Sequence, residues 1–342
     1  MTQRRIRQFR ANKRGYASLW IFLLLVIVTF PAEFITNDKP LIVRYKGAFF
    51  YPLLVDYPES VFGGFLAATD YRDPFIKEEV EANGWMVWPL FKYGHRTINR
   101  SPDTAVPSPP TWENPLGTDN QSRDVLARLV YGFRTTILFS SLLTLFSYIF
   151  GIVTGAIQGY YGGIIDLIFQ RFIEIWSGLP LLFILIILFS MFSPGFWILL
   201  CVLLLFSWTG LSGVVRTEFL RVRNFTYIKA ARALGVNDFD IMRKHIFPNA
   251  LVAALSFLPF TFISAITMLI ALDFIGFGLP PGSASLGELL AQGRANIHAP
   301  WLGIVGFLSI AITLVLIVFI SEAVRDAFDS KKTCDASSSS DH

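Results

Sequence analysis

Charged residues are scarce in this sequence. Asp, Glu, Lys and Arg make up 16% of the 342 residues, whereas a soluble globular chain usually carries about 25%. Hydrophobic residues make up 53%, and 33 residues are Phe. This composition excludes an ordinary soluble protein and indicates that lipid is the main solvent. The net charge of +4 is mild, and the aromatic residues lie in apolar runs instead of alternating with Arg or Lys, which argues against nucleic-acid binding.

Cysteine and histidine are also rare. The two cysteines lie in an apolar run and in the polar tail, and the four histidines are scattered without the paired spacing of a zinc site. These residues are Cys201, Cys334, His95, His245, His298 and His342. The sequence therefore predicts neither a disulfide framework nor a bound metal.

Motifs of enzymes are missing as well. The chain has no G-x-x-x-x-G-K-[ST] phosphate loop, no G-x-S-x-G and no H-E-x-x-H, so it lacks the usual devices for binding ATP or for hydrolysis. Its apolar runs hold no paired catalytic groups of the Ser-Lys or Asp-Asp kind. We therefore predict that the chain is not an enzyme, binds no cofactor and depends on a partner for energy.

Long apolar runs are abundant. Each is close to the ~20 residues that cross a ~30 Å hydrocarbon core, and each must be helical because lipid cannot satisfy free backbone groups. The expected spans are 17–35, 134–158, 172–193, 195–214, 250–275 and 301–321. The first could be a signal peptide, but its near-spanning length and the lack of a small-x-small cleavage site favour an uncleaved span. We predict an all-α polytopic membrane protein with six transmembrane helices.

The distribution of Lys and Arg predicts the orientation. The basic N-terminus (1–16) and the segment 215–249, with seven Lys and Arg, are expected in the cytoplasm together with the tail 322–342. The loop 276–300 has only Arg294 and is expected outside. We call residues 215–249 the connector.

The long polar segment 36–133 is also expected outside, between the first and second spans. It is rich in Pro and Gly, and its turns and extended stretches predict a mixed periplasmic insertion. Weak strand signals occur at 41–54, and a helix is predicted at 75–83.

The connector contains the most informative pattern. A short helix is predicted from Phe225 to Leu234, Gly235 can take the left-handed C-cap conformation, and Asn237 or Asp238 can cap a second helix that ends at Phe247. Pro248 then begins the fifth span. We expect two short helices packed crosswise at the membrane face, the first with a low surface of alanines that another protein could approach closely.

The connector resembles the EAA loop of ABC importer permeases, which reads E-A-A, three residues, G, nine residues and I-x-L-P. Lys229, His245 and Phe247 depart from that pattern, and the other residues hold at the correct spacing. The resemblance implies a coupling helix that sits in a groove of a cytoplasmic ATPase. The residues it implies are Lys229, Ala230, Ala231, Arg232, Ala233, Leu234, Gly235, Asp238, His245 and Pro248.

Four other segments resemble the C-type permease subunit of dipeptide and oligopeptide importers: 9–19, 114–140, 272–301 and 322–329. Within 114–140, Ser122 and Ala127 replace a glycine and a serine of that family's pattern. The resemblance implies a multi-pass protein of the bacterial inner membrane. It also implies three partners, namely a second dissimilar permease, an ATPase that binds ATP and Mg, and a periplasmic peptide-binding protein.

Residues 36–113 depart from ordinary dipeptide permeases, and we call them the insertion. The insertion resembles the Yej-type subgroup, which imports larger peptides including microcin C-type peptide-nucleotides. An alternative is that the permease belongs to an importer of another solute, such as nickel. An ATP-independent secondary transporter is the rival class, but 195–214 and 301–321 lack the buried ionisable residues it would need.

Two further groups of residues have alternative interpretations. Asp273, with Phe274 and Phe277, is a candidate for the substrate pathway, and the alternative is an acid at a helix end. Glycines recur every four residues in the second span at Gly151, Gly155 and Gly159. Such a face lets helices pack closely, either as static packing or as a gate seam.

Overall fold

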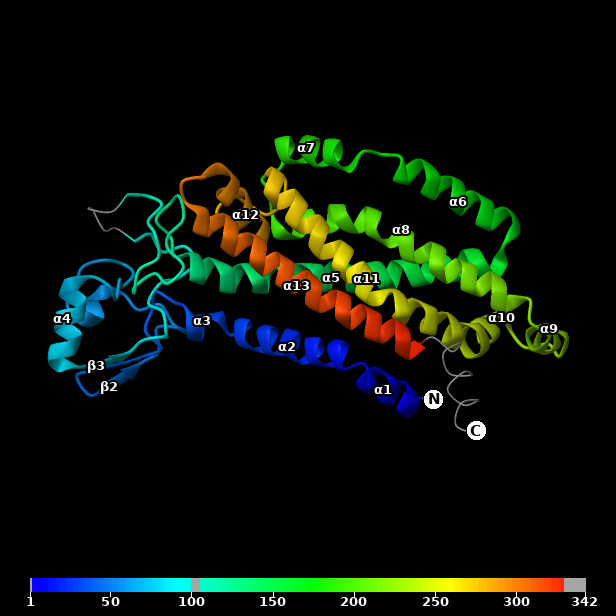
Figure 1. Ribbon diagram of the computed structural model, residues 1–342, viewed down its shortest axis with the longest axis horizontal. Helices are drawn as coiled ribbons and strands as arrows, with labels where there is room; N and C mark the ends of the chain where they lie inside the picture. Colours follow the sequence, from blue (N-terminus) through cyan, green and yellow to red (C-terminus); the bar gives the residue numbers. More distant parts are fainter. Residues whose placement is uncertain (1, 100–104, 329–342) are drawn as a thin grey trace. The chain divides into compact units, whose positions relative to one another are not determined.

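The computed structural model describes residues 2–99 and 105–328 and is mainly helical (Figure 1). The chain divides into two compact units. The first comprises Met1–Phe22, Ile137–Pro280 and Ile312–His342, and the second comprises Leu23–Thr136 and Pro281–Ala311.

The elements follow one another in a simple order. The helices are α1 (Thr2–Ala11), α2 (Lys13–Thr29), α3 (Ala32–Ile35), α4 (Pro74–Asn83), α5 (Val125–Tyr161), α6 (Gly163–Ser177), α7 (Leu181–Met191), α8 (Phe196–Arg223), α9 (Thr226–Ala233), α10 (Asp238–Asp240), α11 (Phe247–Ile275), α12 (Leu286–Ala295) and α13 (Pro300–Phe328). The strands are β1 (Ile42–Tyr45), β2 (Ala48–Phe50) and β3 (Gly84–Val87), and 3-10 or π segments occupy Glu59–Phe62 and Ile241–Ile246.

Four helices in the described part of the chain are long and apolar enough to cross a membrane, and the α6–α7 pair makes a fifth if it counts as one span. The four are α5, α8, the stretch Asp238–Ile275 and α13. The predicted first span, 17–35, falls on two separate helices, α2 and α3. The 17 residues of α2 reach about 25 Å, short of a ~30 Å core. The predicted number of six spans therefore stays a prediction.

The predicted third span, 172–193, is broken. α6 and α7 meet at an angle of 68°, with Gly178 and Pro180 between them. Proline cannot donate a backbone hydrogen bond, and it pushes the preceding residue out of the helical region. This local chemistry ends α6 and starts α7 in a new direction (Figure 1).

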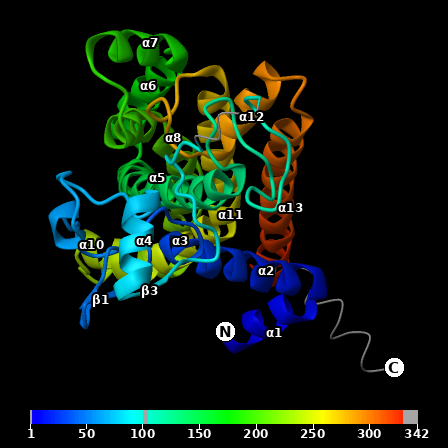
Figure 2. The ribbon, with the colours of Figure 1, turned by 90° about the vertical axis from the view of Figure 1, so that its left-hand side faces the viewer.

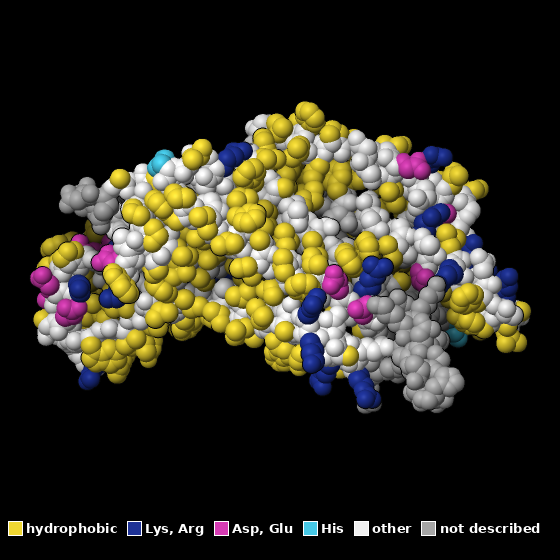
Figure 3. Space-filling view, viewed as in Figure 1, with side chains coloured by type: hydrophobic (Ala, Val, Ile, Leu, Met, Phe, Trp, Pro, Cys, Tyr) yellow, Lys and Arg dark blue, Asp and Glu magenta, His cyan; other side chains and the backbone are white. Residues whose placement is uncertain are grey.

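The first unit is built around α8, which packs against α11. One buried cluster joins α5, α8 and the connector and includes Tyr148, Leu211 and Phe219. Tyr148 donates its hydroxyl hydrogen bond to the carbonyl of Ala254 on α11 at 2.8 Å. The hydroxyl of a buried tyrosine needs such a partner, and this bond links α5 to α11. Hydrophobic side chains cover much of the surface over α7, α11 and α13 on the face shown in Figure 3.

The second unit contains a small antiparallel sheet in the order β2-β1-β3. α4 lies beside the strands in both views (Figure 1 and Figure 2), and Asp73 caps it by accepting a hydrogen bond from the amide of Phe75. A core of six buried residues fills the space between them: Val43, Tyr45, Phe62, Tyr71, Ile76 and Val80. The strand signals at 41–54 and the helix at 75–83 are confirmed, and β3 is an additional element.

A buried ionic cluster lies elsewhere in the second unit. Arg128 on α5 is fully buried, with its Nε 3.4 Å from the Asp119 carboxylate, and it forms an ion pair with Glu288 on α12. Arg123 pairs with Asp119 at 2.7 Å, and Gln292 donates to Glu288 at 2.7 Å. A buried charge needs such compensation. The cluster fixes α12 to the start of α5, although the two helices are far apart in sequence.

Candidate coupling site

The connector begins in the last turns of α8, and the next helix, α9, ends in a defined cap. The amide of Val236 donates to the carbonyl of Ala231 at 3.2 Å, and the amide of Gly235 donates to that of Arg232 at 3.0 Å. Together these bonds form a Schellman motif. Gly235 has a φ of +79°, a region that costs residues with a Cβ roughly 1–2 kcal/mol. The predicted left-handed cap at Gly235 is confirmed.

The helix after this turn differs from the prediction. We expect a separate helix ending at Phe247, but the structure has a continuous helix from Asp238 to Ile275. Ile241–Ile246 forms a π-helical segment just before Pro248. The ring of a proline collides with the carbonyl four residues earlier, and a wider π turn accommodates this disruption. The prediction of a second helix separate from the fifth span is therefore wrong, whereas Pro248 lies in the first turn of α11, the position that the sequence predicts.

Buried isoleucines attach the connector to the membrane helices. The connector has two arms, α9 and the helical residues 238–249. Ile228 on the first arm and Ile241 and Ile246 on the second arm are at most 1% exposed. They share one cluster with Val215 and Phe219 of α8. Burying such a side chain fully contributes about 1.5–3 kcal/mol. The connector is therefore attached to α8 by a buried apolar contact.

The opposite face of the connector is open. Leu234 is 84% exposed and Phe239 is 61% exposed. A Cβ added at Gly235 would meet no described atom within 4 Å. The other implied residues on this face are also exposed: Lys229, Ala230 and Ala233. Arg232 is exposed as well, but its side chain contacts Tyr160 of α5. Exposed large apolar side chains beside small ones are typical of interaction surfaces, and the docking role of this face is a prediction. Ala231 differs because it is partly buried against the cluster beneath.

The remaining implied residues lie on the second arm. His245 and Pro248 are exposed, and the His245 ring lies 6.4 Å from that of Tyr227. Asp238 accepts a hydrogen bond from Tyr160 of α5. Sequence reasoning missed Tyr160, although it directly follows the last glycine of the predicted packing face.

The three glycines lie where α5 meets α8. A Cβ on Gly155 would come within 2.5 Å of the Ser212 carbonyl oxygen, and one on Gly159 within 2.6 Å of that of Arg216. Because these neighbours are backbone atoms, a side chain would force the helices apart. Gly151 likewise faces Trp208 and Leu211. The glycines let α5 and α8 pack closely, and both interpretations of this contact, static packing and a gate seam, stay predictions.

Asp273 lies at the end of α11 and is 8% exposed. Its carboxylate accepts a hydrogen bond from the amide of Leu279 at 2.7 Å, and its carbonyl accepts one from Gly276. Phe274 is half-buried, and Phe277 packs against the core of the first unit. The carboxylate stabilises its own loop, which favours the helix-end interpretation. A role for these three residues in the substrate pathway stays a prediction.

Residues 129–333, which contain the connector, match the family described as binding-protein-dependent transport system inner membrane component. The chain belongs to this family. This permease is 56% identical to the inner membrane ABC transporter permease protein YejE of Escherichia coli K12, over 97% of this chain and 98% of that protein. It is 52% identical to the peptidoglycan transport system permease protein YejE of Agrobacterium fabrum, over 97% and 93%.

Other relatives of the permease cover less of it. The oligopeptide transport system permease protein OppC of Lactococcus lactis IL1403 is 33% identical over 64% of this chain and 75% of its own. A solved chain of the inward-facing MetNI methionine ABC transporter covers 59% of this chain and 96% of its own, with 19% identity and a TM-score of 0.50, and so shares the fold. The resemblance to peptide-importer permeases is confirmed.

Proposed function

We propose that this ABC importer permease moves peptides across the bacterial inner membrane. Its relatives include permeases of oligopeptide, dipeptide and peptidoglycan transport systems, which supports peptides as the substrate class. Similarity to YejE over nearly the whole chain favours larger peptides, including peptide-nucleotides. The observation that carries the proposal is the exposed connector surface around Leu234 and Phe239, attached to α8 by a buried apolar contact in a chain of this family.

Energy comes from a separate ATPase subunit that binds ATP and Mg. The connector docks on this ATPase through the face that contains Leu234, Gly235 and Phe239. When the ATPases close, the connector moves with them, and the buried isoleucines pass the motion to α8 and α11. Packed interfaces switch between discrete arrangements and resist gradual deformation, so this movement suits alternating access. A second, dissimilar permease completes the pathway.

The connector and both chain ends face the cytoplasm in this proposal. The seven Lys and Arg of the connector support it. The insertion then lies outside, where a peptide-binding protein delivers its load. Because the insertion precedes residue 129, it lies outside the part that matches the family, and it provides a docking surface specific to this subgroup.

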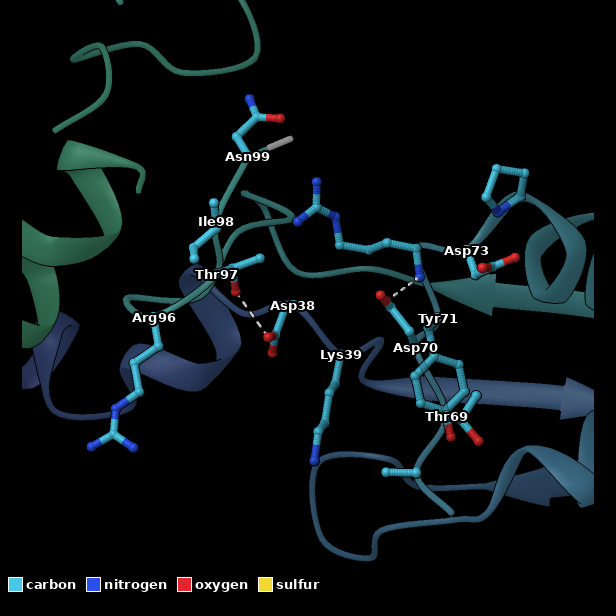
Figure 4. Close-up of a pocket in the computed structure, with 13 residues that line it drawn as sticks. Asp38, Lys39, Thr69, Asp70, Tyr71, Asp73, Arg96, Thr97, Ile98 and Asn99 are labelled. Carbon is cyan, nitrogen blue, oxygen red and sulfur yellow. Dashed lines mark hydrogen bonds between the residues drawn. The ribbon is translucent and has the colours of Figure 1, made fainter. Parts of the chain in front are cut away.

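A pocket in the second unit suits that docking role. It has a volume of about 730 Å³ and is lined by three segments of the chain, 38–39, 68–74 and 96–99. Figure 4 shows the Asp38 carboxylate accepting a hydrogen bond from the Thr97 hydroxyl, and the Asp70 carboxylate accepting one from a backbone amide, that of Arg72. Its charged lining residues have both signs: Asp38, Lys39, Asp70, Arg72, Asp73 and Arg96. A protein loop that carries both signs would find complementary partners here.

The ATPase contact is tested by co-purification from detergent-extracted membranes. Leu234→Glu combined with Phe239→Glu places two carboxylates on the exposed face without touching the core. We expect the ATPase to be lost from this variant and retained by a matched Phe65→Glu variant, since Phe65 is fully exposed in the insertion. Retention of the ATPase by the connector variant would contradict the proposed docking face.

The docking of the binding protein is tested separately. Arg72→Glu reverses one charge in the pocket, where the guanidinium lies 4.5 Å from the centre of the Tyr93 ring. We expect weaker capture of the immobilised binding protein by the complex and unchanged ATPase association. Unchanged capture would show that the pocket is not part of the docking surface.

A further inference from the structure

One tyrosine links the membrane helix α5 to both arms of the connector. Tyr160 lies near the end of α5 and is 2% exposed. Its hydroxyl donates to the carboxylate of Asp238, at the start of the second arm. The same hydroxyl accepts a hydrogen bond from Arg232 Nη2 of α9 at 2.9 Å. Its carbonyl accepts another from Arg223, at the end of α8, at 2.8 Å.

The arrangement makes the phenol the centre of the contact. Arg232 and Asp238 lie 3.7 Å apart, and both side chains are about half exposed. An exposed ion pair of this kind contributes at most ~1 kcal/mol by itself. The buried ring beneath the pair adds a cation–π contact, with the Arg232 guanidinium 5.4 Å from the ring centre. Hydrogen bonds to charged groups are the stronger ones, and here both end on one hydroxyl.

The position of Tyr160 on α5 allows a force on its side chain to displace the helix. Tyr160 follows Gly159, where a Cβ would lie 2.4 Å from Phe219 Cβ of α8. Because the α5 and α8 backbones are in contact there, a force on the phenol acts on the α5 backbone and is not lost in movements of flexible side chains. The ring also packs in the cluster that contains Ile228 and Ile241, one from each arm.

We infer that Tyr160 is a positioning residue that transmits the movement of the connector to α5, through Arg232 and Asp238. The inference rests on the proposed docking of the ATPase on the connector. Its hydroxyl keeps the two arms at a fixed distance from α5, so that a displacement of α9 also displaces α5. Without the hydroxyl, the connector still binds the ATPase, but its motion is lost between the arms and the helix.

The test is Tyr160→Phe in the reconstituted complex, with peptide uptake and ATP hydrolysis measured in the same proteoliposomes. Phenylalanine keeps the ring and its packing and removes both hydroxyl bonds. We expect normal ATPase co-purification, near-normal basal hydrolysis and about a tenfold fall in peptide transported per ATP, within the range typical of coupling between two sites. Tyr161→Phe is the matched control, since Tyr161 is the adjacent residue and half exposed, and should leave the ratio unchanged.

A second variant guards against misfolding. Arg232→Gln acts at the exposed side of the same contact and should lower the ratio in the same way, and the double variant should be no worse than Tyr160→Phe alone. An unchanged ratio in Tyr160→Phe, or loss of ATPase binding in it, would overturn the inference. Failure of the native chain to bind any ATPase would instead refute the proposed function.

Discussion

Replacing Arg128 with Met tests the buried ionic cluster of the second unit. The change leaves the fully buried Asp119 and the Glu288 carboxylate without the guanidinium that faces both. Removing one partner of a buried pair costs about 3–5 kcal/mol. Arg123 remains 2.7 Å from Asp119 and 3.5 Å from Glu288, so we expect the lower end of this range, about 3 kcal/mol. At about 2 °C per kcal/mol for a large chain, Tm falls by roughly 6 °C.

The assay is thermal unfolding of the detergent-solubilised protein at pH 7. Arg134→Met is the matched control on the same helix. Arg134 pairs with Glu33 at 2.8 Å in a partly exposed position, so its loss should cost no more than about 1 kcal/mol.

A double variant separates charge imbalance from loss of packing. Arg128→Met with Glu288→Met removes one charge of each sign and keeps the Arg123–Asp119 pair. We expect it to regain at least half of the Tm lost in Arg128→Met, because the uncompensated carboxylate is gone. A Tm for Arg128→Met within about 1 °C of the native value, or a double variant as unstable as the sum of its single changes, would refute the reasoning.

Three further predictions concern other parts of the chain. Gly155→Val should destabilise the protein by about 1–3 kcal/mol in the same assay, because the side chain meets the Ser212 carbonyl; an unchanged Tm would show that α5 and α8 separate easily. Burial, followed by the positive charges of three nearby arginines, lowers the pKa of His95 to about 4. As the pH falls from about 6.5 to 4, the unfolded chain therefore binds a proton that the native chain does not, and native stability falls. His95→Asn should reduce this loss of stability, and an equal loss in both proteins would contradict the prediction. Asp273→Asn can still accept the amide hydrogen of Leu279 and should retain uptake, whereas Asp273→Ala should reduce it; loss of uptake in Asp273→Asn would support a charged role in the substrate pathway.

Local chemistry made part of the connector predictable. Gly235 and Asn237 act within a few residues of their own position, so the cap after α9 and the start of the next helix could be placed from sequence. Pro248 also acts locally, but its effect depends on whether the helix ends or widens. The π segment before it shows that the surrounding packing favoured a continuous helix, which sequence alone does not reveal.

Contacts between distant residues were not predictable. The segment that contains Asp119, Arg123 and Arg128 resembles the family's pattern, but the sequence does not reveal that both arginines pair with Glu288 on α12. Strand β3 was missed for the same reason, because it forms only by pairing with β1 some forty residues earlier. Tyr160 gave no charge or spacing signal, and its role depends on the two arms of the connector meeting at one hydroxyl.

The most direct test of the account is peptide uptake into proteoliposomes that contain this permease, its partner permease and the ATPase, with the binding protein added on the side of the insertion. We predict uptake that requires ATP and the binding protein and that is lost when Leu234 and Phe239 are both changed to Glu. Uptake by the permease alone without ATP, or full ATP-driven uptake by the connector variant, would contradict the claim that the connector couples this chain to an ATPase.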